Sequence, residues 1–217
     1  ATDADFAKTC RDAWFLCQND AGLTDALKSF LMTRFNRPSR FEKYPPVESK
    51  IFGIGMPKTG TNSLTHALQE FGYRSKHYPK NPMEMGATIA ATDLPVANNF
   101  VDLDKKYENA KFILTVRDDD SWRESAVHHF RSSNKNNRAF AHRKKMFNAR
   151  MPNEEQLMAG KSAHENKVLT YFKDRPADLL VLDIFNGDGY QEMARFLNRA
   201  DVPEGRFPHL NKRQEQN

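Results

Sequence analysis

The chain has 217 residues, 39% of them hydrophobic and 28% charged, which fits one domain with a buried core and excludes a disordered chain. Its formal net charge is +5 at pH 7, which suits an anionic small molecule, an acidic glycan or a nucleic acid but is equally typical of a solvated basic surface. Basic residues are scattered among acidic ones without a stripe of aromatic side chains, which argues against a nucleic-acid partner, and no stretch is apolar enough to span a membrane.

The N-terminal part of the chain predicts a helical extension. Residues 5–35 carry apolar side chains at helical spacing, and the proline-containing stretch 37–50 separates them from the remainder of the chain. We therefore predict an extension at 1–45 that packs on a core domain at 46–217, with one globular unit overall.

The two cysteines, Cys10 and Cys17, fall in this predicted helix. Two helical turns separate them by about 10 Å, which is too far for a disulfide. Free thiols and the lack of a visible signal peptide favour the cytoplasm. The first residue is Ala, so a trimmed N-terminal anchor or signal stays an alternative.

Three short apolar runs predict buried strands, each followed by a helical pattern: 50–55, 111–116 and 179–184. The helices are expected around 64–71, from about Ser121, and around 193–197. Continuous apolar strands that alternate with helices are typical of a parallel sheet covered on both faces. The predicted fold class is therefore α/β, a three-layer sandwich with a central parallel sheet.

The loop after the first run has the features of an anion site. Residues 55–63 read Gly-Met-Pro-Lys-Thr-Gly-Thr-Asn-Ser and join a strand to a helix N-terminus, where backbone N–H groups and the helix dipole favour negative charge. Glycines allow close approach of the backbone, Lys58 adds a positive charge, and the hydroxyls of Thr59, Thr61 and Ser63 are further donors.

This loop departs from the phosphate loop of nucleotide triphosphatases and kinases, G-x-x-x-x-G-K-[ST]. Gly55 and Gly60 have its spacing, but Thr61 and Asn62 come next, and Lys58 stands before the second glycine. A lysine in the usual place reaches the β- and γ-phosphates. Its earlier position here favours a donor with a shorter phosphate chain.

The loop, Pro57 to Leu64, is similar to the 5′-phosphosulfate loop of the sulfotransferases that depend on PAPS (3′-phosphoadenosine 5′-phosphosulfate). A second motif, Thr115 to Trp122, resembles that family's 3′-phosphate segment, and Arg117 and Ser125 have its spacing. The stretches 180–183, 187–190 and 207–212 also resemble the family, so the resemblance covers about 50–213.

The resemblance implies a P-loop NTPase-like fold and transfer of a sulfuryl group from PAPS, without a metal, to a hydroxyl or amine of an unidentified small molecule or glycan. Lys58 would stabilise the leaving phosphate. The residues carried over as donor-binding are Pro57, Lys58, Thr59, Gly60, Thr61, Asn62, Ser63, Arg117, Ser125 and Lys212. A guanidinium and a hydroxyl on the following helix can chelate one phosphate.

The general base has two candidates. Asp93 stands in a segment, 91–96, that resembles the catalytic-aspartate segment of one branch of the family, and burial beside Leu-Pro-Val would raise its basicity. Its alternative role is a helix or turn cap. His77 comes after a short predicted strand and could line the acceptor side, or be an ordinary surface residue. His128 and His129 are expected to contact only solvent or packed side chains.

Two other functions stay open. A small-molecule kinase would bind ATP with magnesium, and a non-catalytic nucleotide- or glycan-binding module would bind the product nucleotide PAP without turnover. The basic run 131–150 could touch an acidic acceptor, although a solvated helical face explains it as well. A homodimer is a further hypothesis.

Overall fold

The computed structural model describes residues 50–132 and 137–210. The predicted extension at 1–45, both cysteines and Lys212 lie outside the described residues. The division of the chain at residue 46 stays a prediction.

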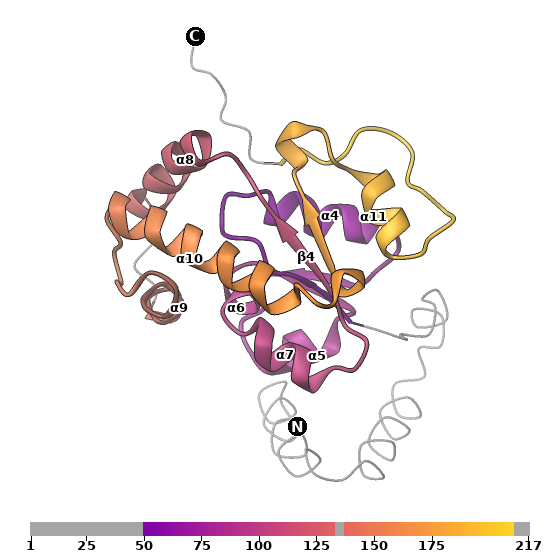
Figure 1. Ribbon diagram of the computed structural model, residues 1–217, viewed down its shortest axis with the longest axis horizontal. Helices are drawn as coiled ribbons and strands as arrows, with labels where there is room; N and C mark the ends of the chain where they lie inside the picture. Colours follow the sequence, from indigo (N-terminus) through magenta and orange to yellow (C-terminus); the bar gives the residue numbers. More distant parts are fainter. Residues whose placement is uncertain (1–49, 133–136, 211–217) are drawn as a thin grey trace, which may run out of the picture. The chain divides into compact units, whose positions relative to one another are not determined.

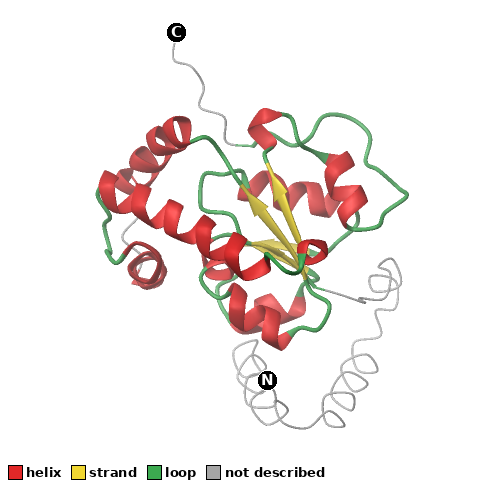
Figure 2. Cartoon of the chain, viewed as in Figure 1, coloured by secondary structure: helices red, strands yellow, loops and turns green. Residues whose placement is uncertain are grey.

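Five parallel strands form the central sheet (Figure 2). In spatial order they are β2 (Ser75–His77), β3 (Ala90–Thr92), β1 (Ile51–Gly53), β4 (Lys111–Thr115) and β5 (Leu179–Leu182). Phe52 of β1 is in register with Ala91 of β3 on one side and with Phe112 of β4 on the other. The predicted α/β fold class with a parallel sheet is confirmed.

The three apolar runs form β1, β4 and β5, and the short strand expected before His77 is β2. Strand β3 was not predicted, because Ala90, Ala91 and Thr92 are too few and too small to produce an apolar run. All three are nevertheless buried, since β3 lies between β2 and β1.

Helices flank the sheet, and most of the described residues between 121 and 173 are helical (Figure 1). The α-helices are α4 (Thr61–Glu70), α5 (Pro82–Ala87), α6 (Leu94–Ala97), α7 (Phe100–Lys106), α8 (Asp119–Ser132), α9 (Asn137–Phe147), α10 (Glu154–Phe172) and α11 (Tyr190–Phe196). Two 3₁₀ turns, η1 (Pro176–Asp178) and η2 (Ile184–Asn186), bracket β5.

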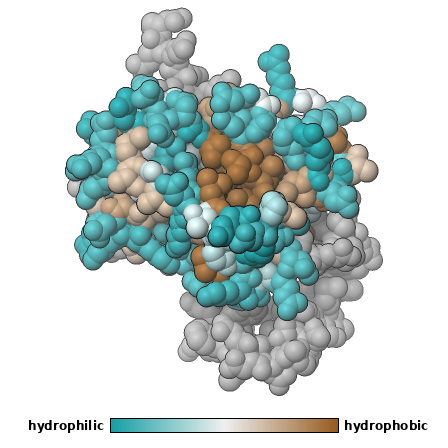
Figure 3. Space-filling view, in the orientation of Figure 1, coloured by the Kyte–Doolittle hydropathy of each residue, from teal (hydrophilic) through white to brown (hydrophobic). Residues whose placement is uncertain are grey.

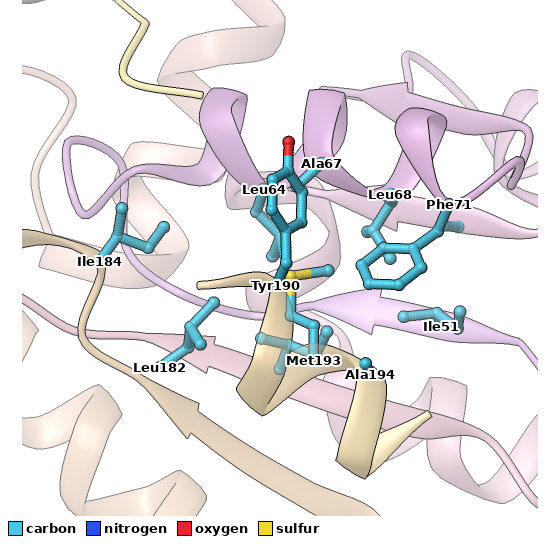
Figure 4. Close-up of a cluster of buried hydrophobic side chains, with 12 residues drawn as sticks. Ile51, Leu64, Ala67, Leu68, Phe71, Leu182, Ile184, Tyr190, Met193 and Ala194 are labelled. Atoms are coloured by element: carbon cyan, nitrogen blue, oxygen red, sulfur yellow. The ribbon is translucent and has the colours of Figure 1, made fainter. Parts of the chain in front are cut away.

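Successive residues of each strand point to opposite faces, which divides the core into layers. Ile51 and Ile113 lie in one cluster with side chains of α4 and α11, and Figure 4 shows Tyr190 and Met193 of α11 facing α4. Phe52 lies in a second cluster, with side chains of β4, α7 and α10. Burying one such side chain stabilises the fold by about 1.5–3 kcal/mol.

A third cluster connects the loop after β1 to the long helices. It contains Met56 of the loop, Trp122 and Phe130 of α8, Phe147 of α9 and Leu157 of α10. The loop is therefore packed from behind by α8, α9 and α10, which fixes its position relative to the sheet.

Some apolar side chains reach the surface. In Figure 3 they gather over β5, which is the edge strand at the front of Figure 1. Val181 of this strand is 42% exposed.

Candidate functional site

A pocket lies at the carboxyl edge of the sheet, where the segments after β1, β3, β4 and β5 meet the last residue of β2, His77. Its enclosed part is about 140 Å³, so a ligand as large as a nucleotide would extend beyond it over the rim. The residues that line it are Pro57, Lys58, Gly60, Thr61, Asn62, Ser63, His77, Asp93, Arg117, Ser125, His129, Ile184, Phe185, His209 and Leu210.

The loop between β1 and α4 forms one wall. Gly60 has φ 94°, the left-handed region that glycine adopts at little cost, and a Cβ there would lie 2.9 Å from Cδ1 of Ile184. Lys58 has φ 74°, which is strained for a residue with a side chain. Helix α4 begins at Thr61 immediately afterwards, so its N-terminus faces the pocket. This geometry is that of an anion-binding helix start.

Thr59 and Gly55 pack against neighbouring protein groups, although both were expected from the sequence to face an anion. The Thr59 hydroxyl was expected to face an anion, but it donates to the carbonyl of Met56 (2.7 Å) and lies 2.6 Å from Oγ1 of Thr115. Thr59 is fully buried and is absent from the pocket wall, because these bonds hold the loop on β4. Gly55 is required for packing, since a Cβ there would lie 1.9 Å from Oγ1 of Thr115.

Side chains of α8 and α10 hold the loop from behind. Trp122 Nε1 donates to the carbonyl of Pro57 at 2.8 Å, and Nε2 of His164 lies 2.7 Å from the carbonyl of Ile54. Burial lowers the pKa of His164, which keeps the imidazole neutral. These two carbonyl groups bond to side chains behind the loop and do not face the pocket. The N-terminus of α4, with its backbone N–H groups, faces the pocket instead.

Arg117 lies beside this wall, directly after β4. Its Nε donates to Ser121 Oγ (2.8 Å) and its Nη1 to the carbonyl of Lys58 (3.3 Å). The guanidinium also stacks over the ring of Phe185 at 4.2 Å. A guanidinium has five N–H donors, so these contacts orient Arg117 and leave donors for an anion in the pocket. Ser125 lines the same pocket from α8.

The Lys58 side chain is partly desolvated. Burial lowers its pKa, and the neighbouring Arg117 lowers it further, while Asp93 opposes the shift. Arg117 and Lys58 are therefore two cations near one pocket, an arrangement that favours a multiply charged anion between them.

The structure brings together the two base candidates. Nε2 of His77 lies 3.0 Å from Oδ2 of Asp93, and Nδ1 of His77 lies 3.1 Å from Oγ1 of Thr92. Asp93 also caps α6 by accepting the N–H of Leu94 at 2.7 Å, so the alternative capping role is real and coexists with a place in the pocket. Its φ of 82° is a strained conformation of the kind that clusters at functional sites.

The sequence interpretation missed His129, which it expected to meet only solvent or packed side chains. His129 lines the pocket one helical turn after Ser125, and that i, i+4 spacing is the signal that could have found it. Burial lowers its pKa, as does Lys58, while Asp93 opposes them. The imidazole is therefore neutral near pH 7.

The C-terminal part of the described chain closes the pocket. The N–H of Leu210 donates to Ser63 Oγ at 3.1 Å, and His209 packs edge-to-face against Phe185 at 6.0 Å. Within residues 50–132 and 137–210, no cluster of His, Cys, Asp and Glu could hold a metal. None of the helices in these ranges has the length and apolar character needed to cross a membrane.

A comparison with known families agrees with this geometry. The family model described as "Sulfotransferase domain" matches residues 50–88 and 83–216, which is more than half of the chain. A search of curated proteins gives no match.

Proposed function

Because the chain belongs to the sulfotransferase domain family, we propose that it transfers a sulfuryl group from PAPS to a hydroxyl or amine of a small molecule or glycan. The observation that carries the proposal is that one pocket contains both a lysine and a carboxylate. Lys58 belongs to the loop 55–63, which we call the anion loop, and Asp93 lines the same pocket. A group held on the loop would face the base across the pocket, as in-line transfer requires.

The donor would occupy two anion positions. Its 5′-phosphosulfate would lie on the loop from Pro57 to Ser63, with Lys58 and the backbone N–H groups at the start of α4. Its 3′-phosphate would lie on Arg117 and Ser125. Phe185, 41% exposed and stacked on Arg117, offers the purine an apolar surface at the rim. The proposed role of Lys212 rests on the resemblance alone.

The proposed reaction is one displacement at sulfur. The acceptor oxygen forms a bond to sulfur while the bond between sulfur and the bridging phosphate oxygen breaks, and that electron pair stays on the phosphate of PAP. Lys58 would neutralise the charge that develops on this oxygen. The acceptor's proton passes to the general base, so that PAP and the sulfated acceptor are the products.

The hydrogen bonds favour Asp93 over His77 as this base. Both ring nitrogens of His77 already have partners, Asp93 and Thr92. Each oxygen of Asp93 accepts one bond, from Leu94 or from His77, and a carboxylate oxygen has a second lone pair. Asp93 can therefore still accept a proton, whereas the role of His77 would be to orient the Asp93 carboxylate.

Calorimetry tests the donor proposal. PAP should bind to the wild-type chain without metal, and Lys58→Ala should weaken that binding. Binding of ATP that requires magnesium, with no binding of PAP, would show a kinase-like site instead.

In a second experiment, radiolabelled PAPS is incubated with the chain and a pool of small alcohols, amines and glycans. Binding of PAP with no labelled product would point to a non-catalytic module.

A further inference from the structure

Two buried threonine hydroxyls join His77 to the start of helix α4. Thr92 Oγ1 lies 3.1 Å from Nδ1 of His77 and 2.6 Å from Oγ1 of Thr65. The carbonyl of Thr61 is within reach of both hydroxyls, at 3.2 Å from Thr92 and 2.9 Å from Thr65. Thr92 is fully buried and Thr65 is 2% exposed, so protein groups alone satisfy them.

The donor and acceptor roles in this network follow from the chemistry of each group. An ionised Asp93 only accepts hydrogen bonds, so Nε2 of His77 must carry a proton to bond it. In a neutral imidazole the other nitrogen is then an acceptor, and Thr92 must donate to Nδ1. Thr65 can supply its own hydroxyl proton to Thr92, since their oxygens lie 2.6 Å apart.

A protonated His77 requires the opposite arrangement. Nδ1 then carries a proton, and Thr92 must accept it and donate elsewhere. The carbonyl of Thr61 lies on its other side and can accept the Thr92 hydroxyl proton. Rotation of one hydroxyl thus satisfies both charge states without moving the ring.

We propose that Thr92 is a positioning residue of the base pair: its hydroxyl donates to His77 when the imidazole is neutral and turns to the Thr61 carbonyl when it is protonated, which keeps Nε2 directed at Asp93 in both states. This role rests on the proposed function, because it acts through Asp93 and touches neither donor nor acceptor.

The same network connects the two halves of the site. Thr61 begins α4 and lines the pocket beside the proposed phosphosulfate position, and Thr92 directly precedes Asp93 in the chain. The two hydroxyls and the Thr61 carbonyl lie within hydrogen-bond distance of one another, so in either proton arrangement the base pair stays connected to the start of α4. This matters because transfer depends on the alignment of donor and base.

Other titratable groups surround Asp93 from four elements: Lys58 of the loop, Tyr78 after β2, His129 of α8 and His142 of α9. Burial shifts the pKa of each toward the neutral form, and Asp93 raises all four values. A pH profile of turnover alone would therefore mix several groups, and the test needs a signal from His77 itself.

The matched pair Thr92→Val and Thr92→Ser tests the proposal. Valine has nearly the shape of threonine and removes the hydroxyl, whereas serine keeps it. The fold should survive in the valine variant, because His77 keeps its bond to Asp93 and Thr65 keeps the Thr61 carbonyl as a partner. Nitrogen NMR of His77 should show the Nε2–H tautomer in all three chains, because Asp93 still requires that proton, and the Nδ1 resonance should shift only in Thr92→Val, where Nδ1 loses its donor.

In the same variants, Thr92→Val should lower kcat by about 10- to 100-fold, as loss of an orienting partner does, and leave PAP affinity unchanged. Thr65→Val, which keeps the Thr92 hydroxyl, should have a smaller effect. A wild-type Nδ1 resonance and wild-type kcat in Thr92→Val would overturn the inference. If the wild-type chain transfers no sulfuryl group, the proposed function fails while the NMR signal still decides the role of Thr92.

Discussion

Nε2 of His77 and Oδ2 of Asp93 lie 3.0 Å apart, so the two residues that compete as general base in the sequence form one unit in the structure. Asp93 is 8% exposed and also caps α6, and His77 bonds Thr92 through its other nitrogen. In the proposed mechanism, His77, with both nitrogens bonded, would orient Asp93, and Asp93 would keep the lone pair that takes the proton.

Asp93→Asn should lower kcat by about 10²- to 10⁴-fold, the usual contribution of a general base. The amide oxygen can still accept the N–H of Leu94, so the cap of α6 and PAP affinity should be retained. The control His77→Asn should reduce kcat less, because it removes only the orienting partner. A larger loss in His77→Asn than in Asp93→Asn would assign the base to His77. Single-turnover rates with PAPS check this.

Lys58→Ala should abolish transfer and leave the fold intact, because the left-handed backbone at this position is no more strained with alanine than with lysine. Near-wild-type turnover of labelled PAPS by this variant would contradict the role of Lys58. Circular dichroism supplies the control for folding.

The rate should also fall at alkaline pH. The proposed role needs the protonated ammonium of Lys58, and burial, with Arg117, lowers its pKa below 10.5. Activity is therefore lost as pH rises through this lowered pKa. Lys58→Arg, whose guanidinium stays charged, should be slower but should lack this alkaline loss. An unchanged alkaline limb in Lys58→Arg would assign the titration to another group.

Arg117→Ala should weaken PAP binding by about 1.5–3 kcal/mol, or roughly 10- to 150-fold, through loss of a charge-assisted hydrogen bond. AMP lacks the 3′-phosphate, so its affinity should change much less. Arg123→Ala, which removes an arginine of helix α8 that pairs with Asp120, serves as the control. Equal losses for PAP and AMP would remove Arg117 from the 3′-phosphate position. Isothermal calorimetry measures all three.

Trp122→Phe should lower the free energy of unfolding by about 1–3 kcal/mol, because it leaves the buried carbonyl of Pro57 without its N–H donor. The loop would also be held less firmly, so PAP affinity should fall. Phe130→Leu disturbs the same cluster without touching the loop carbonyl, and should reduce stability while PAP affinity is retained. Urea titrations with and without PAP separate the two effects.

The alternation of apolar runs and helical patterns predicted the parallel α/β sheet, and the motifs around Lys58 and Arg117 predicted the family. The structure and the family match confirm both. These features could be predicted because consecutive residues of the chain form the buried strand, the tight loop and the start of the helix. The roles of the individual site residues stay predictions.

Strand β3 could not be predicted from the sequence, and the place of His129 was missed although its i, i+4 spacing from Ser125 was visible there. Three small residues carry too weak a pattern to be read as a strand, and a histidine on a charged helix resembles any exposed residue until the helix is packed. The partner of the Thr59 hydroxyl could not be predicted either, because the neighbouring strand β4 supplies it, as Thr115.

The sequence by itself determined that this chain folds around a parallel sheet and has a glycine-containing loop between β1 and α4 with the features of an anion site. Tertiary structure alone decided that Asp93 and His77 lie within hydrogen-bond distance of each other, because β2, which ends at His77, and β3, which ends just before Asp93, become neighbours only in the sheet. Hydrogen bonds across strands depend on register, and register is a property of the folded sheet.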